Sequence, residues 1–366
     1  MGGAGEMGSR AAEDLVNSPD VQQLTLADRN IGAARAWAEK LKARGANVDA
    51  IQVDARNHAQ LVQTLRGHDV AASALGPFYE FEARLVRAAI EAGVDYASIC
   101  DEFDAAQTVF SEFAQKAADS GRIILTGLGA SPGMTNVAAA LLARQMDSVN
   151  RVDIYCYQPL DAGGGEAVLR HMLHIMTGKV PVFRNGQHVP IDALVESCEV
   201  EFPRYGKIRL WNMGHSEPIT IPRFIPGVKA VNFQMGYGKG ANWLVVPAKW
   251  GLFSGQNRLS IAAKFLNWLN AKTKPNQPGW GALRIDVWGT KNGRAEHKLV
   301  CGIGEMREAT GLSLSVGTLM LARRQLTRTT PGLYAPEGII DPVAFIAELR
   351  ARKFEAFYDL AMKSPL

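Results

Sequence analysis

The sequence of 366 residues has few cysteines and no motif that pairs them. Its four cysteines, Cys100, Cys156, Cys198 and Cys301, lie far apart, and no C-x-x-C spacing joins any two of them. A disulfide framework or a cysteine-based zinc site is therefore not indicated. We expect reduced, buried thiols in a cytoplasmic protein.

Three further absences narrow the class of protein. No window approaches the roughly 18 uninterrupted apolar residues of a spanning helix, and the glycine-rich start lacks the basic-then-apolar pattern of a secretory signal. The net charge of +4, from 40 basic and 36 acidic side chains, is small and scattered, which argues against a nucleic-acid partner. No G-x-S-x-G motif occurs, so serine-hydrolase chemistry is not indicated.

What is present is a regular alternation of helical and strand patterns from Gly8 to about residue 130. Short apolar strand candidates are separated by amphipathic helices and short polar connections. Such alternation is typical of a parallel sheet with helices on both faces. We therefore predict an α/β fold, with a Rossmann-type doubly wound parallel sheet over residues 1–130.

The pattern changes after Asn136. Strand candidates there alternate in polarity, and Asn185-Gly186 predicts a hairpin turn. We predict a second α/β domain on a mixed sheet over residues 131–305. Residues 311–326 predict a late helix whose small residues suit close packing on the first domain.

Residues 241–275 predict an amphipathic helix with three of the seven tryptophans nearby. Contact with a membrane is one interpretation. Contact with a second copy or another domain is the alternative interpretation, and it is the more common case, because most apolar stripes are covered by protein. We expect the second, and no membrane partner.

The stretch Gly3-Ala4-Gly5-Glu6-Met7-Gly8 has the G-x-G-x-x-G spacing of a loop that holds a dinucleotide pyrophosphate at a helix N-terminus. Asp28 ends the next predicted strand, where an acidic side chain accepts from ribose hydroxyls. Alternatively, the glycines form a flexible end and Asp28 caps a helix. The predicted cofactor-binding residues are Gly3, Gly5, Glu6, Met7, Gly8, Asp28, Arg29, Asp54, Ala55, Ala74, Leu75, Gly76 and Pro77.

Asp28 and Arg29 favour different cofactors. The Asp28 carboxylate should repel a 2′-phosphate and so favours NAD, whereas Arg29 offers a cation that would bind the phosphate of NADP. We expect NAD or NADP, with NAD slightly favoured.

Only Met1 and Gly2 precede the glycine loop, so the expected first strand is missing. In a sheet of order 3-2-1-4-5-6 that strand is central and buried on both faces. Losing about five apolar residues there, at ~1.5–3 kcal/mol each, would rival the whole ~5–15 kcal/mol stability of a domain. We therefore expect a start codon assigned too late; a strand borrowed from elsewhere in the chain is topologically awkward.

Five segments together carry a family resemblance: GGAGEMG (2–8), AAIEAGVDYASICDE (88–102), GLGASPGMTN (127–136), GHSEPITIPRFIPGVK (214–229) and GLYAPEGIIDPVAFIAEL (332–349). On these the sequence resembles the saccharopine dehydrogenase superfamily over essentially its full length. The CDE motif at 100–102 departs from any one member, which leaves the substrate open.

The resemblance implies hydride transfer at a carbon–nitrogen bond, through an imine, with NAD or NADP. The substrate would be an amino acid or an opine-like compound such as lysine or saccharopine. The resemblance also implies that a C-terminal segment, about 306–350, completes the Rossmann domain, and that the second domain binds substrate and forms a homodimer.

Such chemistry needs groups that bind a carboxylate and a group that accepts and donates the amine proton. Asp101 follows the fifth predicted strand and would steady a cationic amine or iminium; as an alternative, it caps the next helix. The candidate catalytic residues are Asp101, His171, His215 and Glu217, and the candidate substrate-binding residues are Thr135, Asn136 and Arg170.

His171 and His174 share one helix face, but no third ligand is in register, so we expect no metal site. An exposed or core role is an open alternative for His171. A helix-start hydrogen bond is an alternative for Asn136. For the whole chain, two further functions stay open: a non-catalytic NAD(P)-binding sensor or scaffold, and a carbonyl or enoyl reductase.

Overall fold

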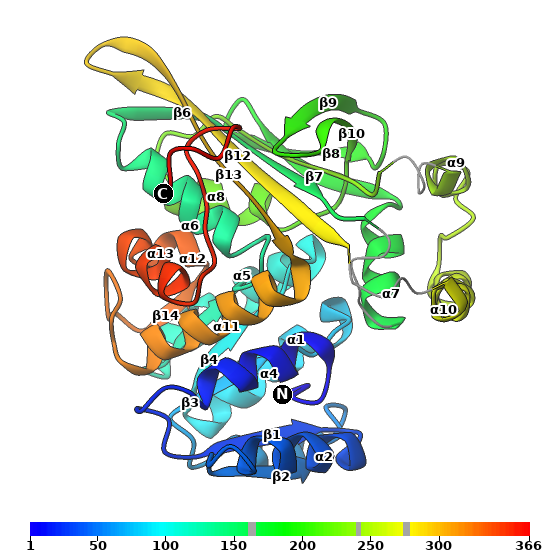
Figure 1. The fold of residues 1–366 in the computed structure, drawn as a ribbon, viewed down its shortest axis with the longest axis vertical. Helices are drawn as coiled ribbons and strands as arrows, with labels where there is room; N and C mark the ends of the chain where they lie inside the picture. Colours follow the sequence, from blue (N-terminus) through cyan, green and yellow to red (C-terminus); the bar gives the residue numbers. More distant parts are fainter. Residues whose placement is uncertain (160–165, 239–242, 274–278) are drawn as a thin grey trace. The chain divides into compact units, whose positions relative to one another are not determined.

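The computed structural model describes residues 1–159, 166–238, 243–273 and 279–366. The chain divides into two compact units. Figure 1 shows the ribbon of the chain coloured along the sequence. Unit 1 comprises residues 1–134 and 307–341, and unit 2 comprises residues 135–306 and 342–366. Residues 342–350, expected in the first domain, therefore lie in unit 2.

Unit 1 is built from parallel strands and helices, as predicted. Its strands are β1 (Leu24–Asp28), β2 (Val48–Gln52), β3 (Val70–Ser73), β4 (Asp95–Ser98), β5 (Ile123–Thr126) and β14 (Gly332–Tyr334). Its helices are α1 (Glu6–Leu15), α2 (Ile31–Lys42), α3 (His58–Leu65), α4 (Phe78–Ala92), α5 (Phe103–Asp119), α11 (Met306–Ala322) and α12 (Pro336–Ile339). All strand pairs are parallel, β1 with β2 in one sheet and β3-β4-β5-β14 in another.

The two parallel sheets of unit 1 are separated by a cavity of about 610 Å³. It is lined by β1, β3, α1 and α11, and among the described residues β1 and β3 each pair along one edge only. Met1 lies at one end of this slot: its nitrogen donates to the Ala72 carbonyl at 2.7 Å, and its carbonyl accepts from the Ala74 N–H at 3.1 Å. The Gly3 N–H donates to the Ala27 carbonyl at 3.4 Å. Met1 to Gly3 therefore run between β1 and β3 with the bonding pattern of a parallel strand.

The predicted late helix packs closely on α1 within unit 1. A Cβ at Gly311 of α11 would lie 2.6 Å from Cγ of Arg10, so only glycine allows this approach. Ser315 of α11 donates to the buried Asp14 carboxylate of α1 at 2.6 Å. The small-residue face thus contacts the first domain, as the sequence predicted.

Unit 2 holds an eight-stranded mixed sheet. Its strands are β6 (Ser148–Tyr157), β7 (Lys179–Arg184), β8 (Gln187–Asp192), β9 (Ser197–Phe202), β10 (Gly206–Asn212), β11 (Ala230–Gly236), β12 (Trp280–Lys291) and β13 (Arg294–Glu305). Its helices are α6 (Met134–Ala143), α7 (Glu166–Ile175), α8 (Glu217–Phe224), α9 (Val245–Lys249), α10 (Gln256–Thr273) and α13 (Pro342–Ala351). The order β13-β12-β6-β11-β10-β9 contains one parallel pair, β6 with β11, and β7 pairs with β8 and β11.

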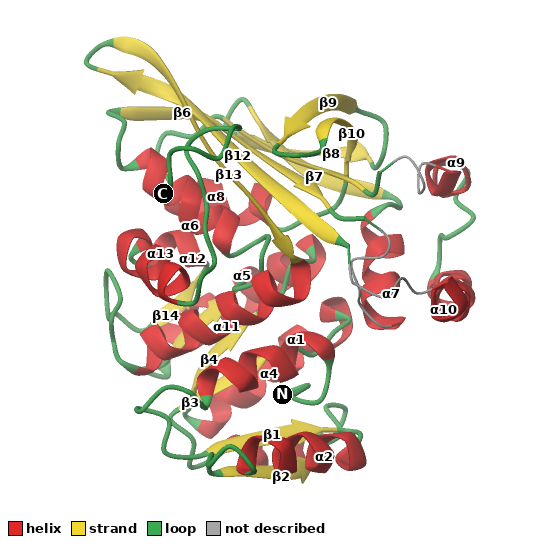
Figure 2. Cartoon of the chain, in the orientation of Figure 1, coloured by secondary structure: helices red, strands yellow, loops and turns green. Residues whose placement is uncertain are grey.

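The predicted hairpin at Asn185-Gly186 joins β7 to β8, with positive φ at both residues (51° and 78°). Along β6, Val152, Ile154 and Cys156 are buried on one sheet face, and α8 packs on the neighbouring β11. Figure 2 shows the strands of this sheet in yellow and the helices of the chain in red. The alternate residues, Arg151 among them, form the opposite, polar face. The predicted α/β class, with parallel sheets and a mixed sheet, is confirmed.

The four cysteines are free thiols, and only Cys198 is not fully buried. In the part of the chain that the structure describes, no helix has the length and apolarity to cross a bilayer.

Candidate functional site

The glycine loop in unit 1 closes tightly on itself. The Gly5 N–H donates to the Gly2 carbonyl at 3.1 Å, and α1 begins at the next residue. A Cβ at Gly8 would lie 2.2 Å from the Gly2 oxygen, so a side chain there would force the loop open. The loop therefore presents main chain directly before a helix N-terminus, where an anion such as a pyrophosphate is favoured.

Asp28 lies beside this loop at the end of β1. Its Oδ2 accepts from the Ala4 N–H at 3.1 Å, and its Oδ1 accepts from the Asn30 N–H at 2.9 Å. Asn30, not Asp28, caps α2, by accepting from the Ala33 N–H. The helix-cap interpretation of Asp28 is therefore wrong, and the carboxylate is held by main-chain donors at the rim of the loop. Arg29 is exposed.

The other predicted cofactor residues have local contacts of their own. Asp54 accepts from the Arg56 N–H at 3.0 Å in the turn after β2. The Ala74 N–H bonds to Met1, and Pro77 directly precedes α4. Leu75 and Gly76 lie between these two, at the carboxyl end of β3. In open α/β sheets this is the edge where ligands bind.

Two buried carboxylates at the same edge were not singled out from the sequence. Glu82 of α4 accepts from Ser98 Oγ at 2.5 Å, Tyr96 OH at 3.0 Å and Thr126 Oγ1 at 3.1 Å. Burial raises the pKa of Glu82 to about 7, opposed by these hydrogen bonds and reinforced by the charge of Glu102. The available signal was a lone glutamate on the apolar face of a predicted helix, which one sequence does not distinguish from a surface residue.

Glu102 is fully buried and accepts from the Tyr79 N–H at 2.5 Å. Together with Glu82 it joins the first turns of α4 to the carboxyl ends of β4 and β5. Burial also raises the pKa of the Cys100 thiol well above its usual value. Asp101 lies between these residues, directly before Glu102, which is the N-cap residue of α5.

In unit 2, three of the four candidate catalytic residues come together. His215 Nδ1 lies 2.5 Å from Glu217 Oε2, and both side chains are buried. The His215 ring stacks on Phe233, with centroids 3.9 Å apart, and the His171 ring lies edge-on at 6.0 Å. The carboxylate fixes the imidazole orientation, as in a carboxylate-oriented general base. The fourth candidate, Asp101, belongs to unit 1.

The candidate substrate-binding residues divide into two kinds. Thr135 Oγ1 donates to Asn136 Oδ1 at 3.1 Å, and Asn136 Nδ2 donates to Thr220 Oγ1 at 3.3 Å, so these residues tie α6 to α8. By contrast, Arg170 Nε and Ser216 Oγ are buried with no hydrogen-bond partner among the described residues. Buried polar groups of this kind are usually satisfied, so both are candidates for contact with a bound molecule.

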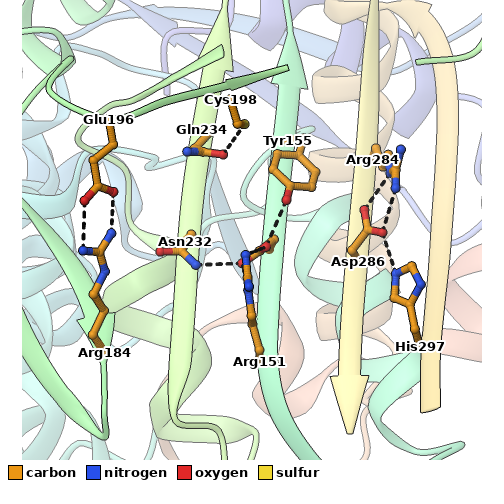
Figure 3. A network of polar contacts seen from close by, with 11 residues as sticks. Arg151, Tyr155, Arg184, Glu196, Cys198, Asn232, Gln234, Arg284, Asp286 and His297 are labelled. Carbon is orange, nitrogen blue, oxygen red and sulfur yellow. Dashed lines mark hydrogen bonds and ion pairs between the residues drawn. The ribbon is translucent and has the colours of Figure 1, made fainter. Parts of the chain in front are cut away.

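The polar face of the unit 2 sheet carries paired charges of both signs (Figure 3). The buried Asp153 accepts from Arg151, Tyr155 OH at 2.9 Å and Asn232 at 2.8 Å. On the neighbouring strand, Asp286 is bound by Arg284 at 2.7 Å and by His297 at 2.6 Å. Burial and the charge of Asp153 raise the pKa of Tyr155 well above its usual value. These contacts satisfy one another, which indicates a structural role.

Comparison with known proteins finds similarity to one family in the first third of the chain. Residues 1–125 match the model of the saccharopine dehydrogenase NADP binding domain. The predicted family resemblance is confirmed. The matched range covers the glycine loop, Asp28 and both buried carboxylates, and the description of the matched model supports a nicotinamide dinucleotide as cofactor.

Relatives extend the similarity beyond that domain. The chain is 25% identical to the carboxyaminopropylagmatine dehydrogenase of Synechocystis, over 95% of this chain and 94% of that protein. It is 24% identical to the carboxynorspermidine synthase of Vibrio cholerae, over 64% of this chain and 62% of that protein. The structure of apo saccharopine dehydrogenase (L-Glu forming) from Saccharomyces cerevisiae shares the fold, with a TM-score of 0.68, 15% identity and 96% coverage of both chains. The chain is thus related to NAD(P)-binding dehydrogenases.

Proposed function

We propose that the protein is an NAD(P)-dependent oxidoreductase that transfers a hydride at the carbon–nitrogen bond of an amino acid or opine-like amine. The observation that carries the proposal is the buried His215–Glu217 pair in a chain whose other unit has a dinucleotide loop. The named relatives support the substrate class, because both names describe carboxyalkyl derivatives of an amine.

Different residues of the chain would bind the cofactor, bind the substrate and transfer the proton. The α1 N-terminus and the glycine loop would hold the pyrophosphate, and Asp28 would accept from the ribose hydroxyls. The nicotinamide, when bound, supplies or accepts the hydride. His215, held by Glu217, takes the proton that the amine nitrogen loses as the C–N single bond becomes C=N, and returns it in the reverse direction. Arg170 would bind the substrate carboxylate, with Thr135 and Asn136 shaping its surroundings, and Asp101 would steady the cationic nitrogen.

For the cofactor we propose NAD in preference to NADP. The Asp28 carboxylate is fixed by the Ala4 and Asn30 N–H groups, so it cannot swing away from a 2′-phosphate without losing both bonds. The name of the matched family model and the exposed Arg29 support the opposite choice. Titration with NADH and with NADPH, following tryptophan fluorescence, decides between them; Asp28→Ala should improve NADPH binding, and Arg29→Ala should weaken it.

The catalytic proposal is tested by separating cofactor binding from turnover. His215→Ala should abolish substrate-dependent reduction of NAD or NADP across a panel of carboxyalkyl amines and amino acids, while NADH still binds. His58→Ala is a matched control, because His58 is an exposed residue of unit 1 that bonds Glu91. If the cofactor binds tightly but no compound of the panel is oxidised or reduced, the non-catalytic sensor function would be favoured instead.

We also propose a cytoplasmic homodimer. The family resemblance, which implies a homodimer formed through the second domain, supports self-association. Light scattering coupled to size exclusion measures the mass directly, and a monomer at all concentrations would refute the dimer.

A further inference from the structure

The segment around α9 and α10 in unit 2 exposes a concentration of apolar side chains. Seven of them are half or more exposed, from 50% for Val246 to 78% for Trp250. They are Trp243, Val246, Trp250, Leu252, Ile261, Phe265 and Trp268. Single exposed apolar residues are ordinary, but a group with three tryptophans and a phenylalanine marks an interaction surface.

Helix α10 has two apolar sides. Leu259, Ala263 and Leu266 are buried, and α10 packs on α7 (Figure 1). At about 100° per residue, Ile261, Phe265 and Trp268 fall on the opposite side, where they are exposed. The Phe265 and Trp268 rings stack on each other at 5.9 Å. We call this outward side of α10, together with Trp250 and Leu252, the aromatic surface.

The segment of sequence that carries the aromatic surface has charges of one sign. Between Glu217 and Asp286 the sequence has nine lysines and arginines and no aspartate or glutamate. Among the described residues, Lys249, Arg258 and Lys264 are exposed. Helical geometry sets Arg258 on one flank of the apolar stripe and Lys264 on the other, and Lys249 precedes Trp250.

We propose that the aromatic surface docks the protein on an anionic lipid membrane. Tryptophan and phenylalanine side chains occupy the headgroup region, and flanking cations meet lipid phosphates, which is the arrangement of a helix that lies in the membrane interface. This surface includes none of the residues proposed for catalysis. The inference therefore stands or fails independently of the enzymatic proposal.

The charge argues for this occupant over two others. A two-fold contact between copies sets the same surface against itself, which would bring the cations of one copy against those of the other. A single-stranded nucleic acid would stack on aromatic rings but leave aliphatic side chains such as Ile261, Val246 and Leu252 without a partner. An anionic lipid surface satisfies both the cations and the aliphatic groups.

The test uses the full chain with vesicles of phosphatidylcholine alone and of phosphatidylcholine mixed with phosphatidylglycerol. We expect co-sedimentation with the mixed vesicles at least tenfold stronger than with the neutral ones, a blue shift of tryptophan emission, and release as salt is raised. This comparison of the two vesicle types uses the wild-type protein alone. Equal binding to both vesicle types, or none to either, would overturn the proposal.

Variants locate the surface. Phe265→Ser combined with Ile261→Ser, and separately Arg258→Glu combined with Lys264→Glu, should each reduce vesicle binding by tenfold or more. Val195→Ser is the matched control, since Val195 is 61% exposed elsewhere in unit 2, and it should bind like wild type. Circular dichroism checks that each variant is folded. If the wild type does not bind vesicles, two further results would assign the surface to another occupant. Loss of self-association in the Phe265 variant would assign it to a second copy, and loss of oligonucleotide binding would assign it to a nucleic acid.

Discussion

Glu82 Oε1 lies 2.5 Å from Ser98 Oγ, inside unit 1 and shielded from solvent. The same carboxyl accepts from Tyr96 and Thr126, so one side chain of α4 binds hydroxyls from both β4 and β5. These strand ends form the edge at which an open α/β sheet binds its ligand. The protonation state of Glu82 therefore affects the packing directly beneath the proposed cofactor site.

The raised pKa of Glu82, about 7 against an ordinary 4.5, makes the stability of unit 1 depend on pH. Between these values the folded protein binds a proton that the unfolded chain has released, so the unfolding free energy should fall as pH rises from 4.5 to 7. The fall should be about 3 kcal/mol. Denaturant unfolding across this range measures it.

Glu82→Gln is the matched variant, because the amide keeps an acceptor and a donor in the same space without titrating. Its unfolding free energy should lack this fall and should exceed that of wild type above pH 7. An unchanged pH dependence in the variant would assign the effect to another group.

Changing Glu217→Gln should lower kcat by roughly a hundredfold or more, within the range for loss of general acid–base catalysis. The amide cannot stabilise a protonated His215 or fix its tautomer as the carboxylate does. Steady-state kinetics with the best substrate of the panel measures the change, and NADH titration should be unaffected. A variant with normal kcat would remove the pair from the proton transfer.

Gly8→Ala should open the dinucleotide loop. The new Cβ would meet the Gly2 oxygen at 2.2 Å, and relieving that overlap should cost about 1–3 kcal/mol. We expect weaker NADH binding by fluorescence and a lower melting temperature. Gly32→Ala, in helix α2, is the control. An added Cβ at Gly32 would lie 3.5 Å from Asn30 Oδ1, an ordinary contact distance, so alanine should raise stability by about 0.5–1 kcal/mol.

The sequence by itself determined the order of helices and strands, the dinucleotide loop and the hairpin at Asn185-Gly186. These features depend on residues close together in the chain: glycine spacing, hydrophobic period and the positive φ that asparagine and glycine accept.

Only the tertiary structure decided which side chains meet. Glu82 and Thr126 are 44 residues apart, and burial around both converts an ordinary glutamate into one that titrates near neutrality. His171 approaches His215 because α7 and the start of α8 adjoin in space, and Asp28 is fixed by the Ala4 N–H, which precedes it by 24 residues. Such contacts depend on packing between residues far apart in the sequence, and local residue patterns do not predict that packing.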